Sequence, residues 1–464
     1  MIKSVIKKFV DLLGEENVLA DPVDLLVYEQ DGALALRGRP DVVVFPQSAE
    51  EMARVVQLAY ELDMPIVPRG SGTSLSGGAA AVKGGVVIST VKMRRVEVDL
   101  ANEVAVVEAG VVNDWINQHL QKAGYQYPID LAYQYAADPG SQRVSTIGGN
   151  VAHNSGGIKC FKYGVTVNQL RGLTVVTPPG EVRRLGGKAF EYPGYDLVGL
   201  VAGSEGTLAL VAEAVVRIVP VYEHTVTILA SFRSLSTAAR AVSLVVSSGA
   251  MPVAMELMDR LAIEAVESGP YAAGLPRDVE AVLLIEVEGS PPGARQEAEK
   301  VAQLLKRGGA DFVEVVEDRK AAAKIWAARR QAFGAMGYVG PNYVVEDGTI
   351  PRRSLATALE IAKAAAARRG LRVANVFHAG DGNLHPLILY DERRPGEREK
   401  ALEAGEEILE ACLELGGTIT GEHGVGYMKK RLLAKMYRDV ELSLMKSIKD
   451  VFDPKGLLNP GKVL

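Results

Sequence analysis

Three glycine-rich segments lie between apolar runs in the first half of the chain, and they constrain its fold more than any other feature. They occupy residues 69–78, 138–157 and 203–207. Consecutive residues without Cβ atoms expose backbone N–H groups, which can form a concave anion-binding site. The first segment fits neither the P-loop pattern nor a G-x-G-x-x-G turn that opens a helix. One extended ligand with phosphates would use all three segments, and three plain turns in a glycine-rich fold are the alternative.

Length and composition limit the other possibilities. A chain of 464 residues exceeds the usual size of one core, so we expect two or three domains. The formal net charge of −5 disfavours nucleic acid and anionic membranes as partners. Without a signal peptide or an apolar run of about 18 residues, the default is a cytoplasmic protein. Two cysteines are too few to hold an iron–sulfur cluster.

The first 220 residues alternate β-type and helical runs. Among the predicted strands are 41–45 and 65–68, and a helix is expected over 49–62. Ser48 has the character of its N-cap, with Glu51 completing a capping box. The segment 138–157 contains too many glycines for regular structure and is too long for a simple turn, which favours a functional loop.

The sequence changes in texture after Pro220. A strand, a helix and a strand are expected at 225–232, 236–248 and 253–258, and the same order follows at 282–316. This pattern predicts an α+β fold whose second domain has an antiparallel or mixed sheet with helices on one face.

Histidines gather in two short segments of the second half. His378 and His385 flank a Gly-Asp-Gly-Asn turn, so their side chains can converge from its two arms, and Glu422 and His423 follow later. Histidine and carboxylate side chains can build a metal site and a proton-transfer base together. Two histidines beside a glycine turn are ordinarily structural, so the sequence leaves both interpretations open at this point.

Several motifs together resemble one flavoprotein superfamily. They include Pro68-Arg-Gly-Ser-Gly-Thr-Ser, Thr146-Ile-Gly-Gly-Asn150 and Gly203-Ser-Glu-Gly-Thr-Leu in the first half. His378-x-Gly-Asp-Gly-Asn-Leu-His385 and Gly421-Glu-His-Gly424 follow in the second. They resemble the FAD-linked 2-hydroxyacid dehydrogenase branch of the vanillyl-alcohol oxidase/p-cresol methylhydroxylase superfamily. Glycolate oxidase FAD subunits and D-lactate dehydrogenases belong to that branch.

The resemblance implies three regions. Residues 1–220 would form an FAD-binding domain of two subdomains, 221–425 a substrate or cap domain with the metal site, and 426–464 a segment that returns to the FAD domain. FAD would be bound noncovalently. The residues expected to bind it are Arg69, Gly70, Ser71, Gly72, Thr73, Ser74, Gly77, Asp138, Pro139, Ser141, Thr146, Gly148, Gly149, Asn150, Asn154, Gly156, Gly157, Glu205, Gly206, Thr207 and Asn459.

The resemblance also implies a reaction. His378, His385 and Glu422 would bind a divalent metal, for which zinc, iron and manganese suit such ligands. His423 would act as general base and Arg329 as a clamp for the substrate carboxylate. A small 2-hydroxy acid, D-lactate or glycolate, would then pass a hydride to flavin N5 and leave as the 2-oxo acid. Leu387 replaces an Asn of the dicarboxylate-specific relatives, which favours the small substrate.

Electrons would leave the flavin through a partner protein, either an iron–sulfur subunit or an electron-transfer flavoprotein. Any peripheral membrane association would come through that partner. The alternatives are a non-catalytic FAD-binding subunit of a redox complex and an oxidase for another 2-hydroxy acid.

Overall fold

The structure is a computed structural model, and it describes residues 2–33, 36–122, 133–189 and 192–464. The chain divides into two compact units. The first holds residues 1–157, 164–221 and 422–464, and the second holds residues 158–163 and 222–421. The short insert 158–163 therefore packs with the second unit although it follows a glycine-rich segment of the first.

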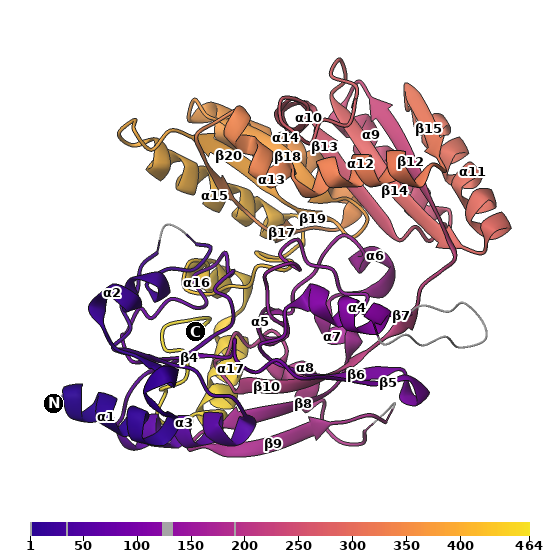
Figure 1. The fold of residues 1–464 in the computed structure, drawn as a ribbon. Coiled ribbons are helices and arrows are strands. Elements are labelled where there is room, and N and C mark those ends of the chain that lie inside the picture. The colour runs from indigo at the N-terminus through magenta and orange to yellow at the C-terminus, as the bar shows by residue number, and fades with distance from the viewer. Residues whose placement is uncertain (1, 34–35, 123–132, 190–191) are drawn as a thin grey trace. The chain divides into compact units, whose positions relative to one another are not determined.

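The described part of the first unit holds two larger sheets and a two-stranded one, in which β7 pairs with β11 (Figure 1). One of the larger sheets has the order β1-β2-β4-β3, with β2, β4 and β3 parallel. The other larger sheet is antiparallel, with the order β5-β6-β10-β8-β9. The strands are β1 (Val18–Leu19), β2 (Val42–Val44), β3 (Ile66–Arg69), β4 (Val86–Ser89), β5 (Val96–Asp99), β6 (Val104–Glu108), β7 (Tyr133–Gln134), β8 (Leu170–Thr177), β9 (Glu181–Gly186), β10 (Leu210–Arg217) and β11 (Val219–Pro220).

Helix α3 (Ala49–Glu61) connects β2 to β3 and begins as the sequence predicts. The Ser48 side chain accepts a hydrogen bond from the Glu51 amide, which confirms the N-cap. The Glu51 carboxylate accepts one from the Gln47 amide, one residue before the Ser48 amide that the expected capping box would use. The other helices of this unit are α1 (Ile2–Leu13), α2 (Pro22–Leu25), α4 (Asn113–Lys122), α5 (Ile147–His153), α7 (Thr166–Gln169), α8 (Leu197–Val201), α16 (Lys430–Met436) and α17 (Asp439–Phe452).

Helix α5 corrects one prediction. The segment 138–157 was expected to lack regular structure, yet its middle is helical. Ile147 and Val151 are fully buried there. A Cβ on Gly148 would lie 2.7 Å from the Ala109 side chain, so the glycine permits a close approach to the residue that follows β6. Burial and close packing therefore outweigh the low helix propensity of glycine.

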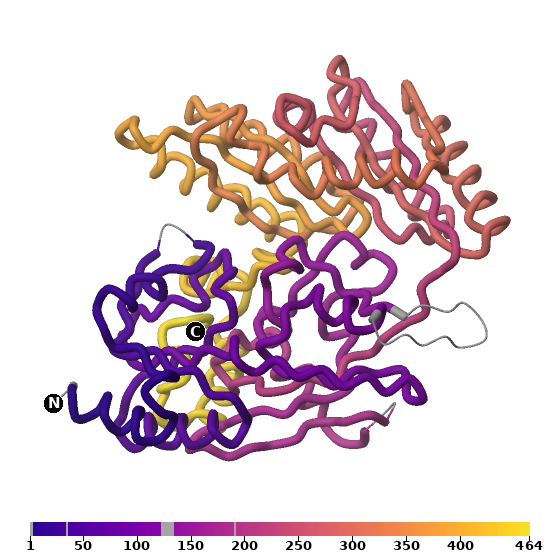
Figure 2. The backbone as a smooth tube through the Cα atoms, in the orientation of Figure 1, coloured from indigo at the N-terminus to yellow at the C-terminus, as the bar shows by residue number. Residues whose placement is uncertain are grey.

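The C-terminal residues complete the first unit. Leu458 forms a parallel bridge to Ile66 in β3, and the Asn459 amide donates to the Ile66 carbonyl at 2.7 Å. Figure 2 shows this last segment, in yellow, beside the indigo backbone of the N-terminal part.

The second unit is built on an antiparallel sheet with the order β15-β12-β14-β13-β18-β19-β17. Strands β12 and β13 point the same way with β14 between them, so the two expected strand–helix–strand segments interleave. The strands are β12 (His224–Phe232), β13 (Ala254–Asp259), β14 (Ala281–Gly289), β15 (Phe312–Val316), β16 (Asn342–Val345), β17 (Gly348–Thr349), β18 (Arg372–His378), β19 (Asn383–Leu384) and β20 (Pro386–Tyr390).

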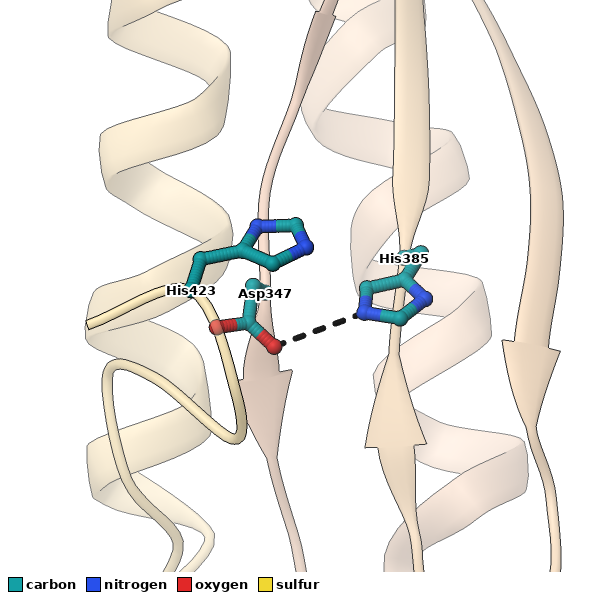
Figure 3. Close-up of side chains that lie close together, drawn as sticks. All are labelled: Asp347, His385 and His423. Carbon is teal, nitrogen blue, oxygen red and sulfur yellow. Dashed lines mark ion pairs between the residues drawn. The ribbon is translucent and has the colours of Figure 1, made fainter. Parts of the chain in front are cut away.

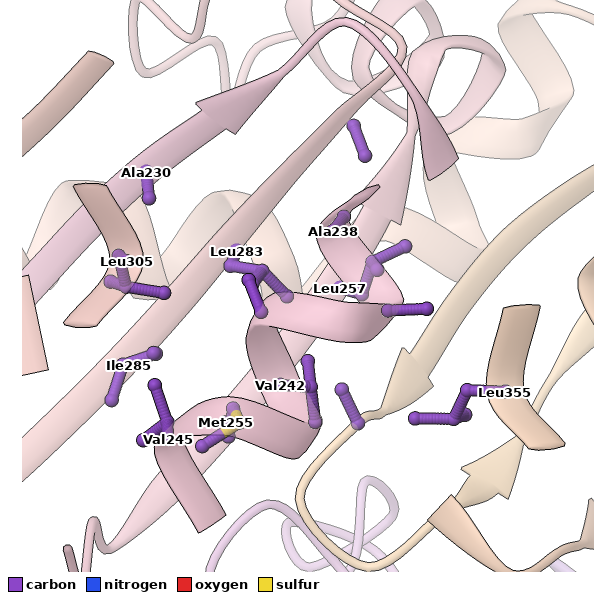
Figure 4. Packing of buried hydrophobic residues seen from close by; sticks show 14 of the residues in the cluster. Ala230, Ala238, Val242, Val245, Met255, Leu257, Leu283, Ile285, Leu305 and Leu355 are labelled. Carbon is purple, nitrogen blue, oxygen red and sulfur yellow. The ribbon is translucent and has the colours of Figure 1, made fainter. Parts of the chain in front are cut away.

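Helices cover both faces of this sheet, which refines the expectation of helices on one face. On the first face, α9, α11 and α14 bury residues such as Val242, Leu283 and Leu305 (Figure 4). On the second, α10, α12 and α13 pack over Leu229, Met258 and Leu284. Both faces of the central strands are apolar, so both need cover. The helices are α6 (Cys160–Tyr163), α9 (Leu235–Ser247), α10 (Arg260–Glu267), α11 (Pro291–Arg307), α12 (Arg319–Arg330), α13 (Ala332–Ala335), α14 (Leu355–Arg368) and α15 (Glu397–Glu414).

The α+β class predicted from the sequence is confirmed by this mixture of sheets and helices. Among the described residues, no helix combines the length and the apolar character needed to cross a bilayer.

Candidate functional site

The three glycine-rich segments meet in the first unit. A Cβ on Gly70 would lie 2.1 Å from Thr146 Oγ1, and one on Gly206 would lie 2.3 Å from the Pro68 ring. The Glu205 amide donates to the Ala152 carbonyl at 2.8 Å. These contacts join all three segments, and glycine is needed where their backbones approach so closely.

Asn459 joins the segments from the C-terminal end of the chain. Its Nδ2 donates to the carbonyls of Gly78 and Glu205, at 2.9 and 2.7 Å. The Glu205 carboxylate in turn accepts from the amides of Val425 and Gly426, at 2.6 and 2.8 Å. One buried network thus fixes the first and third glycine segments and the chain just after His423.

Other residues expected at the cofactor site also shape these loops. Ser71 donates to the Val144 carbonyl, Ser74 accepts from the Gly78 amide, and the Asn154 side chain accepts from the Val167 amide. The remaining expected residues lie in the same three segments, at Gly72, Thr73, Gly77, Asp138, Pro139, Ser141, Gly148, Gly149, Asn150, Gly156, Gly157 and Thr207.

Arg69 is placed differently from most of this set. Its guanidinium turns into the unit, where Nη2 donates to the Gln30 carbonyl at 2.8 Å and the group lies 5.4 Å from the Tyr28 ring centroid. Only 7 % of Arg69 is exposed. The side chain braces the loop against an earlier part of the chain, and a direct contact with a cofactor stays a prediction.

The two histidines around the Gly-Asp-Gly-Asn turn converge in the second unit. His378 ends β18, His385 precedes β20, and their ring centroids lie 5.2 Å apart. The Gly382 amide donates to the His378 carbonyl, and Asp381 accepts from the Asn383 amide at 3.2 Å. Both histidines are buried, with 8 and 1 % exposed. The turn therefore brings two imidazoles together in a place with little water.

A buried carboxylate and a buried guanidinium lie behind His378. His378 Nδ1 lies 2.8 Å from Glu256 Oε1. Arg329 Nε lies 2.8 Å from Glu256 Oε2, and Nη2 lies 2.5 Å from the same oxygen. The clamp role expected for Arg329 stays a prediction, and the structure shows that its Nε–Nη2 edge faces Glu256.

A second buried carboxylate faces His385. Asp347 Oδ1 lies 3.4 Å from His385 Nε2, and Figure 3 shows this pair. Asp347 Oδ2 accepts hydrogen bonds from Thr420 Oγ1 at 2.6 Å and from the Gly421 amide at 3.0 Å. Asp347 thereby holds the end of the second unit, one residue before Glu422.

Glu422 and His423 begin the last segment of the first unit. The His423 carbonyl accepts from Ser76 Oγ at 3.0 Å, and His423 Nε2 lies 3.8 Å from Glu422 Oε1. Gly424 follows with a φ of 82°, where a Cβ would meet the His153 ring and the Glu205 carboxylate. The roles of Glu422 as ligand and His423 as base stay predictions.

Sequence reasoning missed Glu256 and Asp347 as neighbours of the histidines. Glu256 offers one local signal, because it is a carboxylate inside the otherwise apolar run Ala-Met-Glu-Leu-Met. Asp347 offers none, since it stands in an ordinary loop between two short strands.

Two known protein families match the chain in sequence. A family described as FAD linked oxidases, C-terminal domain, matches residues 221–463, and one described as FAD binding domain matches residues 40–186. The chain belongs to the FAD-linked oxidase family. FAD is therefore its cofactor, and the chain is an oxidoreductase.

Curated members of the FAD-linked oxidase family resemble the chain over nearly its whole length. Glycolate oxidase subunit GlcD of Escherichia coli (strain K12) is 41 % identical over 96 % of this chain and 88 % of its own length. The GlcD subunit of Bacillus subtilis (strain 168) is 38 % identical over 99 % of this chain and 97 % of its own length. A D-lactate dehydrogenase of Anaerostipes hadrus is 31 % identical over 99 % of this chain and 97 % of its own length.

Solved structures agree on the fold. A p-cresol methylhydroxylase with substrate bound superposes with a TM-score of 0.83 at 18 % identity, covering 99 % of this chain and 96 % of that one. An alkyldihydroxyacetonephosphate synthase gives 0.76 at 20 % identity, with 99 and 84 % covered. These structures confirm the fold that the resemblance implied.

The residues of the first unit fit FAD. Ser145 Oγ, Thr146 Oγ1 and Asn150 Nδ2 are buried, and no described residue makes a hydrogen bond with these three atoms. Buried polar atoms normally have partners. They lie on and just before α5, beside the Gly70 loop, where the hydroxyls and phosphates of a flavin dinucleotide would supply those partners.

Proposed function

We propose that the chain oxidises a small 2-hydroxy acid, glycolate or D-lactate, to the 2-oxo acid in an FAD- and metal-dependent reaction. The named relatives act on glycolate and D-lactate, as their names say. The observation that carries the metal part is the buried convergence of His378 and His385, with Glu256 and Asp347 behind them. Buried imidazoles backed by carboxylates are the arrangement that divalent metal sites commonly use.

The donor set in the second unit suits a divalent ion. Neutral imidazoles and carboxylates bind zinc, iron and manganese. We propose His378, His385 and Glu422 as the ligands. The position of Gly421 supports Glu422 as the third ligand. The Gly421 amide donates a hydrogen bond to Asp347, and Glu422 is the next residue along the chain. A bound divalent cation would act as a Lewis acid that lowers the pKa of a substrate hydroxyl.

His423 is the proposed base that takes the hydroxyl proton. The Ser76 hydroxyl holds its carbonyl, and the Glu205 network holds the two residues after Gly424. A base fixed through its backbone keeps its imidazole in a defined position for proton transfer. Bound FAD would supply the oxidising chemistry, as the acceptor of a hydride from the substrate carbon.

The apolar surroundings of Leu387 support the proposal of a small monocarboxylate as substrate. Leu387, two residues after His385, is fully buried among Ala374, Val376 and Leu389. A second substrate carboxylate would lack a polar partner at this position, and an unpartnered buried charge is costly. Arg329 is the proposed clamp for the single carboxylate of the substrate.

The reduced flavin needs an electron acceptor. The chain has two cysteines, Cys160 and Cys412, so it cannot bind a four-thiolate cluster itself. We propose that electrons pass to an iron–sulfur subunit or an electron-transfer flavoprotein, and that the protein works in the cytoplasm or at a membrane through that partner.

Anaerobic flavin reduction tests the substrate and the base. The purified holoenzyme should lose its yellow absorbance with glycolate or D-lactate and keep it with L-lactate or D-2-hydroxyglutarate. His423→Ala should slow the bleaching by about 10²- to 10⁴-fold, the usual contribution of a general base, while FAD content stays unchanged. Bleaching of the variant at the wild-type rate would rule out His423, and no bleaching by any hydroxy acid would favour a non-catalytic flavin subunit.

A further inference from the structure

A buried chain of three charged or polar side chains runs through the second face of the second unit. Arg329 on α12, Glu256 on β13 and His378 at the end of β18 are joined by contacts of 2.8 Å. Glu256 is not exposed at all, and Arg329 is 3 % exposed. Burying charged side chains is costly even when they are paired. We therefore expect these three residues to have a function.

The strand register explains why Glu256 reaches His378. Strands β13 and β18 are antiparallel, and Glu256 lies directly opposite His378 in their pairing. Opposed residues of neighbouring strands point to the same face of a sheet and lie within side-chain reach. On both sides of Glu256 along that face stand Ala254 and Met258, which belong to the apolar cluster. The carboxylate is therefore aimed at the histidine by the sheet itself.

The chemistry of the pair fixes the imidazole tautomer. An ionised carboxylate only accepts hydrogen bonds, so the proton of the contact belongs to His378 Nδ1. A neutral His378 then carries its lone pair on Nε2, the atom that would bind a metal ion. Metal-binding histidines commonly donate their second nitrogen to a carboxylate in this way, which fixes both tautomer and ring orientation.

Arg329 makes a buried carboxylate tolerable at this point. An isolated buried carboxylate would take up a proton and lose its ability to act only as an acceptor. The guanidinium offsets the charge through its Nε–Nη2 edge, and Trp326 anchors the same helix by donating from Nε1 to Thr227 Oγ1 at 3.0 Å. The three residues thus form one unit: Arg329 holds Glu256, and Glu256 holds His378.

We propose that Glu256, held by Arg329, is a positioning residue that orients His378 for metal binding. The proposal rests on the metal site proposed above. It adds a part of that site which no sequence motif indicates, and it gives Arg329 a task distinct from clamping a substrate carboxylate. The two tasks differ in what they change: loss of a clamp raises KM and leaves metal binding intact, whereas loss of a positioning pair weakens metal binding.

The experiment replaces the pair rather than one partner. Removing Glu256 alone leaves Arg329 buried without its partner, which is strongly destabilising, whereas replacing a whole buried pair with apolar residues is often tolerated. The test variant is therefore Glu256→Met combined with Arg329→Met. Asp259→Asn is the matched control, because it removes another buried carboxylate from the same strand, away from His378.

Metal per chain is measured by elemental mass spectrometry after dialysis against a graded chelator series, with added zinc as the probe ion. FAD per chain and thermal unfolding are recorded on the same samples. We expect the double variant to bind zinc about 10- to 100-fold more weakly than the wild type, with FAD content unchanged and Asp259→Asn like the wild type.

Two results would overturn the inference, and they can be told apart. A double variant that binds zinc as tightly as the wild type would remove the positioning role and leave the proposed metal site standing. A wild type that binds no more zinc than His378→Ala would remove the metal site itself, and the positioning role with it.

Discussion

Single buried side chains of the second unit carry information that local sequence does not show. Glu256 and Arg329 are 73 residues apart, and Glu256 and His378 are 122 apart. The convergence of His378 and His385 could be predicted because only six residues, with a glycine turn among them, lie between the two histidines. Glu256 could not, since its meaning comes from strand register, and register between distant strands is not a local property.

The surroundings of Asp259 also depend on strand register, and they give a prediction for mildly acidic pH. Asp259 caps α10 by accepting from the Ala262 amide at 3.0 Å, and it accepts from the amide and side chain of Asn375 at 2.8 Å. Burial raises the pKa of Asp259 from 3.8 to about 6, although these hydrogen bonds oppose the shift. The folded protein therefore retains a proton there that the unfolded chain has already lost.

The free energy of unfolding should accordingly fall as pH rises from about 4 to about 6. A pKa raised by about two units corresponds to as much as about 3 kcal/mol across this window. Asp259→Asn should flatten the dependence, because asparagine has no proton to lose. Urea unfolding at a series of pH values measures both proteins. Equal slopes for variant and wild type over this window would show that another group is responsible.

Elements of regular structure were predictable where apolar residues follow one period. The strand Val42–Val44 and the helix Ala49–Glu61 appear as expected because β-branched runs and a 3.6-residue pattern mark them. Helix α5 was missed, because its glycines lower the helix signal and its stability comes from burial of Ile147 and Val151. The helices α10, α12 and α13 on the second face of the sheet were missed. Strands that are apolar on both faces show no alternation of apolar and polar residues, so the sequence does not reveal that a second face is covered.

The close approach of the first two glycine segments gives a prediction at the scale of elements. Gly70→Ala would place a methyl group against Thr146 Oγ1, whose present distance to such a Cβ is 2.1 Å. The loops must separate, which costs about 1–3 kcal/mol, so FAD affinity should fall by roughly tenfold or more. Gly140→Ala is the control, since a Cβ there meets nothing within 4 Å.

FAD per chain, measured by absorbance after gel filtration, compares the two variants with the wild type. We expect loss of flavin from Gly70→Ala and retention in Gly140→Ala. Full flavin content in Gly70→Ala would mean that the contact between these loops does not shape the cofactor site.

At the scale of the whole molecule, the two units contribute different groups of functional residues. The first unit gathers the glycine segments and the C-terminal Asn459 around buried polar atoms that fit FAD. The second gathers His378 and His385 with two buried carboxylates. Family membership could be predicted from the motifs, since short glycine and histidine patterns are local. The partners of those motifs could not, because they come from strands and helices far away in the chain.

Metal dependence of flavin reduction tests the central claim most directly. The holoenzyme is stripped with chelator under conditions that leave FAD bound, mixed anaerobically with D-lactate or glycolate, and then supplied with zinc, iron or manganese. The account predicts that stripping abolishes bleaching of the flavin, that one of these ions restores it, and that none restores it in His378→Ala. Bleaching at the original rate in a stripped enzyme that retains its FAD would contradict the account.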